Sequence, residues 1–151
     1  MTENAGSHPG IRIRRAGRTE VAELLAFWRR AAEGTSHTDD ADGVGRLLVR
    51  DPEAVIVAER EGRIVGTVIA GWDGWRCHLY RLAVDPAARR QGIAGLLLEA
   101  AEERFRALGG RRGDAMVLDA NTLGQSAWSS AGYRAEPQWT RWTKRLSAPR
   151  G

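Results

Sequence analysis

The segment that constrains the fold most tightly is a strand pattern that leads through a short loop into the longest helical pattern of the chain. Arg76 to Val84 has the apolar character and length of a strand, and Asp85-Pro86 interrupts it. Gln91 to Leu108 then carries apolar residues at helical spacing, and Gly109-Gly110 ends that pattern. A helix that follows a strand so closely buries one side against the sheet to which the strand belongs. The segment therefore predicts a layered domain that combines a sheet with helices.

The remaining patterns add strands and helices around this segment. Arg60-Glu61-Gly62-Arg63 separates two apolar runs and indicates a hairpin, because Gly favours a tight turn. Antiparallel pairs with intervening helices predict an α/β (α+β mixed) class, with one sheet and helices on both sides. The expected strands are Ile11–Arg14, Ala54–Glu59, Ile64–Ala70 and Ala115–Leu118, with a final hairpin over Tyr133–Leu146. The other expected helices are one that starts at Thr19, a short one over Val44–Val49, and one over Asn121–Ala131.

Length and composition indicate one globular domain. A chain of 151 residues, 42% hydrophobic and 28% charged, can bury a core of its own. We expect a single domain over residues 11–146, with disordered tails at 1–10 and 147–151. No apolar run has the roughly 20 residues of a membrane span, and the single cysteine, Cys77, cannot form an internal disulfide. A cytoplasmic location is the simplest expectation.

The basic residues are scattered along the chain. The formal net charge is +4, and Lys144 is the only lysine among the 23 basic residues. Binding to nucleic acid or to a membrane surface favours a dense basic tail or a basic amphipathic helix, and neither is present. The charge pattern therefore argues against a membrane or nucleic acid as the partner.

The loop before the long helix has the features of an anion site. The first backbone N–H groups of a helix have no partner within it, and the helix dipole is positive at that end. Gly92 has no side chain to block an approaching phosphate, and Arg89 can add a charged donor. The Gly-Lys-Ser/Thr ending of a P-loop is absent, so a nucleotide γ-phosphate is not indicated. A plain loop-to-helix junction is the alternative.

These residues resemble a known family. Arg89-Arg90-Gln91-Gly92-Ile93-Ala94 matches the Arg/Gln-x-x-Gly-x-Gly/Ala motif of the GNAT superfamily (Gcn5-related N-acetyltransferases). The order of elements from Ile11 to Leu146 is also similar, and the Gly71-Trp72-Asp73-Gly74 turn is similar to small bacterial acetyltransferases of the YpeA type. The resemblance implies a GNAT-like central mixed, mostly antiparallel sheet with splayed fourth and fifth strands and about four flanking helices. It also implies acetyl-CoA as co-substrate, an amine as acceptor and no metal.

The resemblance assigns residues to the cofactor. It implies that the backbone of the loop and first helical turn contacts the pyrophosphate, and that a bulge near Ala83 splays the strand. It implies that Leu82 and Val84 pair with the pantetheine arm as if it were a strand, and that Asn121 binds the pantetheine. Asn is also a preferred N-cap residue, and the two roles are compatible. The expected cofactor-binding residues are Leu82, Ala83, Val84, Arg89, Arg90, Gln91, Gly92, Ile93, Ala94, Gly95, Asn121 and Trp128.

The chain departs from the family pattern at Trp128. The family often has a Tyr there, seven residues after the Asn, as general acid for the departing thiolate. Indole N–H is a donor that does not usefully ionise, so Trp128 can hydrogen-bond a sulfur but cannot reprotonate it. Tyr133 lies past the end of the expected helix, where packing is its simplest role. We expect no dedicated acid, because a thiolate is a good leaving group.

Two residues on one face of the predicted strand are candidates for catalysis. His78 and Tyr80 are two apart and so share a face. The resemblance implies that His78 lies where some GNAT enzymes have a Glu base and others a His. Imidazole titrates near neutrality, which suits removal of a proton from an ammonium. Packing beside the sheet is the alternative for both residues. Cys77 points to the opposite face and is expected to be a small buried hydrophobe.

The acceptor side of the site falls in the expected loop over Gly34–Asp40. In this family such a region commonly forms a wall for the acceptor, and carboxylates there would attract a cationic amine. A solvated loop is the alternative. The resemblance thus implies an acyl-CoA-dependent N-acetyltransferase that transfers an acetyl group directly to an unidentified amine. Homodimers are usual for such domains, and the sequence leaves the oligomeric state open. A degenerate domain that binds acyl-CoA as a sensor or scaffold remains an alternative.

Overall fold

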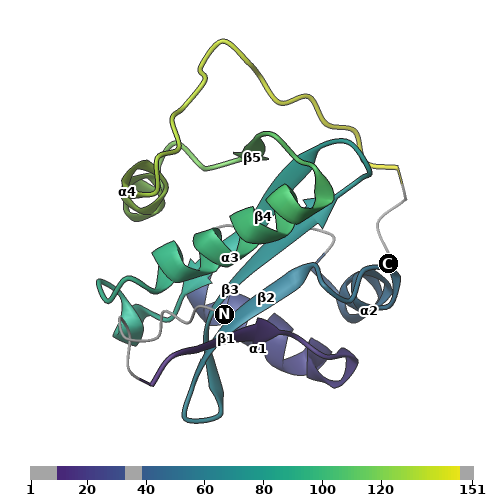
Figure 1. Cartoon of the computed structure of the whole chain (residues 1–151), viewed down its shortest axis with the longest axis vertical. Helices are drawn as coiled ribbons and strands as arrows, with labels where there is room; N and C mark the ends of the chain where they lie inside the picture. Colours follow the sequence, from purple (N-terminus) through teal and green to yellow (C-terminus); the bar gives the residue numbers. More distant parts are fainter. Residues whose placement is uncertain (1–9, 33–38, 147–151) are drawn as a thin grey trace.

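The computed structural model describes residues 10–32 and 39–146, and both expected tails therefore lie almost wholly outside it. The described residues form one five-stranded sheet in the order β1-β2-β3-β4-β5 with four α-helices (Figure 1). The first four strands are antiparallel and β5 is parallel to β4. This confirms the predicted mixed, mostly antiparallel class. The strands are β1 Arg12–Arg15, β2 Val55–Arg60, β3 Arg63–Trp72, β4 Cys77–Val84 and β5 Gly113–Ala115. The helices are α1 Val21–Ala31, α2 Ala41–Arg50, α3 Ile93–Leu108 and α4 Thr122–Ser130.

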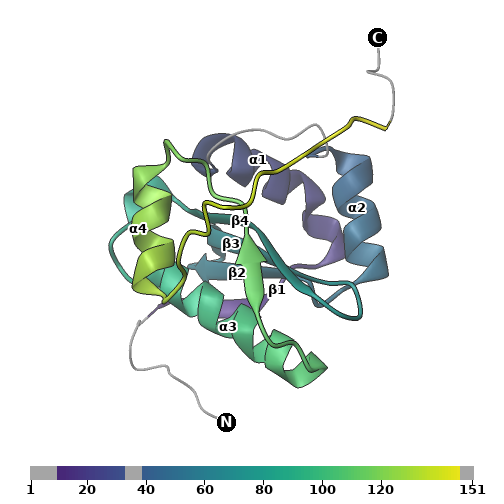
Figure 2. The same cartoon turned by 90° about the horizontal axis from the view of Figure 1, so that it is seen from above.

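Helices cover both faces of the sheet, and each face has its own apolar core. Figure 2 shows α1 and α2 on one side of the sheet and α3 on the other. The first core contains Leu24 and Phe27 of α1 together with Leu48 of α2. The second contains Leu97 and Phe105 of α3. None of the helices in the described part has the length and apolar character needed to cross a bilayer.

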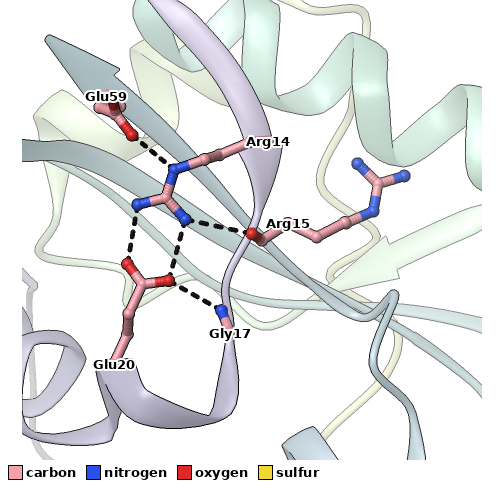
Figure 3. Close-up of polar contacts among 5 residues, drawn as sticks. All are labelled: Arg14, Arg15, Gly17, Glu20 and Glu59. Atoms are coloured by element: carbon pink, nitrogen blue, oxygen red, sulfur yellow. Dashed lines mark hydrogen bonds and ion pairs between the residues drawn. The ribbon is translucent and has the colours of Figure 1, made fainter. Parts of the chain in front are cut away.

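An ion-pair cluster fixes β1 to its surroundings. The Arg14 guanidinium contacts both oxygens of Glu20, at 2.9 and 2.7 Å, and its Nε contacts Glu59 on β2 (Figure 3). Glu20 also accepts the backbone N–H of Gly17 at 2.7 Å, which tightens the 3-10 turn Arg18–Glu20 ahead of α1. The Arg14 guanidinium holds the pKa of Glu20 below its usual range, and the pKa of Arg14 is raised in return. The cluster therefore joins β1, β2 and the start of α1.

A β-bulge in β4 reverses the order in which its side chains alternate between the two faces of the sheet. Ile69 of β3 pairs with Tyr80, but Thr67 pairs with Ala83, so two residues of β4 lie opposite one residue of β3. The first of the two, Arg81, has a φ of +52°. Leu79 before the bulge belongs to the α3 core, whereas Ala83 after it belongs to the α1 core. The bulge thus lies at Arg81–Leu82, slightly before the predicted position.

The fourth and fifth strands pair over a short length and then diverge. The β4–β5 ladder joins Cys77, His78 and Leu79 to Gly113, Asp114 and Ala115, and it ends there. The rest of β4, including Leu82 and Val84, continues beyond the end of that ladder. This divergence is the splay predicted between the fourth and fifth strands.

Two predictions about the C-terminal third are wrong. The strand expected over Ala115–Leu118 lies earlier, as β5 over Gly113–Ala115, and shares only Ala115 with the expected range. The hairpin expected over Tyr133–Leu146 does not form, since no strand occurs within the described residues 133–146. Figure 1 shows that segment as an irregular loop. Its apolar residues Trp139, Trp142 and Leu146 are three and four apart, so no strand could place them on one face. All three are exposed instead.

Candidate active site

The loop between β4 and α3 is shaped by left-handed backbone at two positions. Asp85 accepts the N–H of Ala87 at 3.0 Å and starts the 3-10 turn Pro86–Ala88. Arg90 then has a φ of +66°, and Gly92, the N-cap of α3, has a φ of +81°. No side chain caps this helix, so its first N–H groups keep their capacity for an external acceptor. Helix α3 starts at Ile93, two residues later than predicted.

The side chains of this junction differ in their surroundings. Arg89 folds back, and its Nε lies 3.3 Å from the carbonyl oxygen of Val84. Gln91 accepts a hydrogen bond from Arg60, the last residue of β2. Arg89, Arg90, Gln91, Gly92 and Gly95 are exposed, Ala94 is half-buried, and the Ile93 side chain is buried in the α3 core. Ile93 can therefore offer a ligand only its backbone.

Gly66 on β3 brings α3 close to the sheet. A Cβ there would lie 3.0 Å from Ile93 and 3.0 Å from Leu97, both in the first turns of the helix. Gly66 pairs with Val84, the last residue of β4. The absence of a side chain thus sets the distance between the helix start and the end of β4. Sequence reasoning passed over this residue, because a Gly inside an apolar strand pattern is the only mark it leaves.

A cavity of about 100 Å³ lies where β4 and β5 diverge. It brings together four of the predicted site residues from two separate parts of the chain, β4 and the α4 segment: Tyr80, Leu82, Asn121 and Trp128. His78, Ala83 and Val84 do not line it, and Ala83 is buried toward α1. A larger cavity of about 460 Å³ between β1 and α3 contains no predicted site residue. The remaining lining residues of the smaller cavity are Ala32, Leu79, Arg81, Met116, Val117 and Leu118.

Asn121 is the N-cap of α4. Its Oδ1 accepts the N–H of Gly124 at 2.8 Å, as the N-cap prediction requires. A Cβ on Gly124 would lie 2.3 Å from Nδ2 of Asn121, so this glycine is needed for the side chain to fold over the helix start. The cap uses only Oδ1, and the amide N–H₂ group can still donate to a ligand.

Trp128 and Tyr133 pack against each other at the other end of α4. Their rings meet edge to face with centroids 5.0 Å apart, and the Tyr133 hydroxyl donates to Glu102 on α3 at 2.7 Å. Burial and the hydrogen bond to Glu102 raise the pKa of Tyr133. Tyr133 thus ties α4 to α3, in agreement with the packing role expected for it.

His78 lies between two carboxylates. Its Nδ1 is 3.1 Å from Oδ1 of Asp114 on β5, and its Nε2 is 3.5 Å from Oδ2 of Asp73 in the β3–β4 turn. The backbone N–H groups of Arg76 and Trp75 bind Asp73 at 2.6 and 2.8 Å and hold the pKa of that carboxyl below its usual range. Sequence reasoning named neither aspartate as a partner of His78, since each reaches it only through the folded sheet.

Tyr80 lies on the same face as His78, as predicted. Their ring centroids are 6.3 Å apart, and Tyr80 is 53% exposed. Partial burial raises the pKa of the Tyr80 phenol, which keeps it protonated near neutral pH. Cys77 is buried on the opposite face in the α3 core, and burial raises the pKa of its thiol. Its predicted role as a small buried hydrophobe is confirmed.

The expected acceptor loop is only partly visible, because residues 33–38 lie outside the described part of the chain. Of its two carboxylates, Asp39 forms an ion pair with Arg81, and Asp40 is the N-cap of α2, accepting from Gly43 at 2.7 Å. Both carboxylates therefore have protein partners. Among the described residues, no group of three or more His, Cys, Asp or Glu side chains is arranged to hold a metal ion.

The architecture is that of N-acetyltransferases of known structure. A PaiA N-acetyltransferase from Thermoplasma acidophilum, solved with coenzyme A, superposes with a TM-score of 0.74 at 19% identity, over 83% of this chain and 91% of that one. An aminoglycoside N-acetyltransferase solved with CoA gives 0.72 at 21% identity, over 96% of this chain and all of that one.

Sequence relatives extend the similarity. An acetyltransferase of Sodalis glossinidius is 30% identical over 127 residues, which is 84% of this chain and 89% of the relative. One of Photorhabdus laumondii is 33% identical over 99 residues, 66% and 69% of the two chains. The model of the acetyltransferase (GNAT) family matches residues 18–133. The chain therefore belongs to the acetyltransferase (GNAT) family. It is an N-acetyltransferase.

Proposed function

We propose that this enzyme transfers the acetyl group of acetyl-CoA directly to a primary amine, with His78 as general base. The observation that carries the proposal is the cavity where β4 and β5 diverge, which gathers Leu82, Asn121 and Trp128. Tyr80 lines the same cavity and shares a face of β4 with His78. The acceptor itself is an amine of a small molecule, a peptide or a protein.

Acetyl-CoA is proposed to bind along β4 and at the start of α3. The uncapped N–H groups after Gly92 suit the pyrophosphate. Gly92 has a left-handed φ, which a residue with a side chain would adopt only with strain, so the position favours a glycine that leaves these N–H groups open to a ligand. Leu82 and Val84 lie beyond the β4–β5 ladder and can offer backbone groups to the pantetheine. The N–H₂ group of Asn121 is a further donor at the cavity.

The proton of the acceptor ammonium is proposed to pass to Nε2 of His78. An ionised carboxylate only accepts hydrogen bonds, so Asp114 selects the tautomer of neutral His78 that carries its proton on Nδ1. Nε2 lies 3.5 Å from Oδ2 of Asp73, beyond the length of a normal hydrogen bond, and the negative charge of that carboxylate favours binding of an ammonium beside Nε2. The amine, once neutral, attacks the thioester carbonyl, and a backbone N–H of β4 beyond the end of the β4–β5 ladder stabilises the oxyanion. Collapse breaks the C–S bond and releases the thiolate, and the remaining extra proton on the new amide nitrogen passes to water. Tyr80 stays protonated, so its hydroxyl can donate a hydrogen bond to a substrate bound in the cavity.

Turnover of acetyl-CoA against pooled amines, read as free thiol, tests the activity. His78→Gln keeps a hydrogen-bonding side chain but cannot act as a base, and we expect kcat/KM to fall about 100-fold, within the range of general-base catalysis. Cys77→Ala is the matched control from the neighbouring position on the opposite face, and its kcat/KM should stay near that of the wild type. Equal activity of the wild-type and His78→Gln enzymes from pH 6 to 9 would remove the base assignment.

A non-catalytic acyl-CoA sensor is a second candidate function. Two observations favour it: Trp128 stands where the family often has an ionisable Tyr, and the hydroxyl of nearby Tyr133 is bound to Glu102. Isothermal titration with CoA distinguishes the two functions. Binding of CoA without thiol release across the amine panel would support the sensor, whereas thiol release with any amine would exclude it.

A further inference from the structure

A fully buried threonine links α1 to the bulge in β4. Thr67 on β3 is the single buried polar residue among those described, with no exposed surface. Trp28 Nε1 donates to its hydroxyl oxygen at 2.9 Å, and the hydroxyl donates to the carbonyl oxygen of Arg81 at 2.8 Å. The hydroxyl is therefore used as both acceptor and donor. Three elements, α1, β3 and β4, are joined at one oxygen.

The carbonyl at the end of this chain belongs to the bulge residue. Arg81 has the left-handed φ of +52° that the bulge demands and that a residue with a Cβ adopts reluctantly. Its carbonyl is bound by Thr67, and its side chain is bound by Asp39, with Nε 3.3 Å from Oδ1. An unfavourable backbone conformation persists when the surrounding contacts determine it. Here one of those contacts comes from inside the core.

The bulge decides which way the next residues of β4 point. Because Arg81 and Leu82 together lie opposite one residue of β3, Leu82 and Val84 pack toward the α3 core and Ala83 packs toward α1. Without the extra residue, Leu82 would share a face with Tyr80. Leu82 lines the cavity and, with Val84, is proposed to bind the pantetheine.

We infer that Thr67 and Trp28 are positioning residues, which hold the Arg81 bulge and thereby set the backbone of β4 in register for acyl-CoA. This inference rests on the proposed site along β4. Neither side chain lines the cavity, and their effect on the ligand passes through the carbonyl of Arg81. Trp28 packs in the core like its neighbours, but its N–H also makes the first of the two hydrogen bonds that lead through Thr67 to the carbonyl of Arg81.

The test compares three variants by isothermal titration with coenzyme A. Thr67→Val keeps the shape and removes the hydroxyl, and its Kd for CoA should rise about tenfold, the equivalent of one buried hydrogen bond. Thr67→Ser keeps the hydroxyl and should restore the Kd to within about threefold of the wild type. Trp28→Phe removes the N–H donor and also replaces the indole by a smaller ring, and it should raise the Kd in the same direction as Thr67→Val.

The control is Val44→Ala, in the same core but without a bond to the bulge. It should lower Tm and leave the Kd unchanged, so a loss of stability alone cannot imitate the predicted effect. A folded Thr67→Val protein with wild-type Kd, or a Thr67→Ser protein as weak as Thr67→Val, would overturn the inference. If Thr67→Val does not fold, Trp28→Phe and Thr67→Ser decide in the same way. Failure of the wild type itself to bind CoA would instead refute the proposed function.

Discussion

Helix α3 offers a matched pair of glycines for testing the proposed pyrophosphate site. Gly92 at its N-terminus has φ +81° and ψ 9°, and Gly109 at its C-terminus has φ +93° and ψ 10°. Both are exposed and both are left-handed. A residue with a Cβ pays about 1–2 kcal/mol for this conformation. Gly92→Ala and Gly109→Ala should therefore lower the free energy of unfolding by similar amounts, with Tm lower by about 2–8 °C at this chain length.

Only the change at Gly92 should affect CoA. The methyl group introduced by Gly92→Ala would lie beside the N–H groups at the start of α3. If the backbone of residue 92 left its left-handed conformation to relieve strain, those N–H donors would no longer point toward the pyrophosphate. A hydrogen bond to a charged group contributes about 1.5–3 kcal/mol, so loss of one raises the Kd about 10- to 150-fold. Gly109 lies at the far end of a helix of 16 residues, and nothing lies within 4 Å of a Cβ built there.

Isothermal titration with CoA, together with thermal unfolding of the free proteins, measures both effects. The expected result is two variants of similar Tm, of which Gly92→Ala alone binds CoA weakly. Equal Kd values for Gly92→Ala, Gly109→Ala and the wild type would refute the assignment of the pyrophosphate to this turn. Equal weakening in both variants would also refute it, because general destabilisation of α3 would then explain the loss.

Three further outcomes follow from the contacts described. The pKa of Glu20 is below its usual value of 4.5 in the folded protein, so its pairing with Arg14 stabilises the fold above that value and is lost as pH falls below it. The difference in urea-unfolding free energy between the wild type and Glu20→Gln should therefore be present at pH 7 and shrink below pH 4.5. Tyr133→Phe should lower stability by about 1–2 kcal/mol through loss of the bond to Glu102, with kcat unchanged in the thiol-release assay. Trp128→Tyr should leave kcat/KM within about twofold of the wild type if no acid is required.

Local sequence features predicted the parts of the fold and the site that depend on residues close together in the chain. The β4–loop–α3 unit is such a region, because Gly92 and the helical spacing after it are set by backbone geometry within a few residues. The shared face of His78 and Tyr80 follows from the two-residue period of a strand. The N-cap role of Asn121 is equally local.

The missed features depend on contacts between distant segments. Asp114 reaches His78 only because β5 pairs with β4 in parallel, and the register of that pairing is not written in either strand alone. The hairpin expected over Tyr133–Leu146 failed for a related reason. Its start is fixed elsewhere, by the bond from Tyr133 to Glu102, and β5 has only three residues to which a further strand could pair.

In the proposed site, the bulge in β4 allows one strand to serve both substrates. Before it, His78 and Tyr80 lie on the face opposite α3, and Leu79 lies toward α3. In a regular strand, Leu82 would lie on the same face as Tyr80. If the ladder with β5 continued along β4, the backbone N–H and C=O groups of Leu82 would be bonded to β5 and could not bind a ligand. The extra residue turns Leu82 toward α3 just where the ladder ends. Base and cofactor groups can thus lie four residues apart on one strand without competing for a face, and this separation depends on the bonds that hold Arg81.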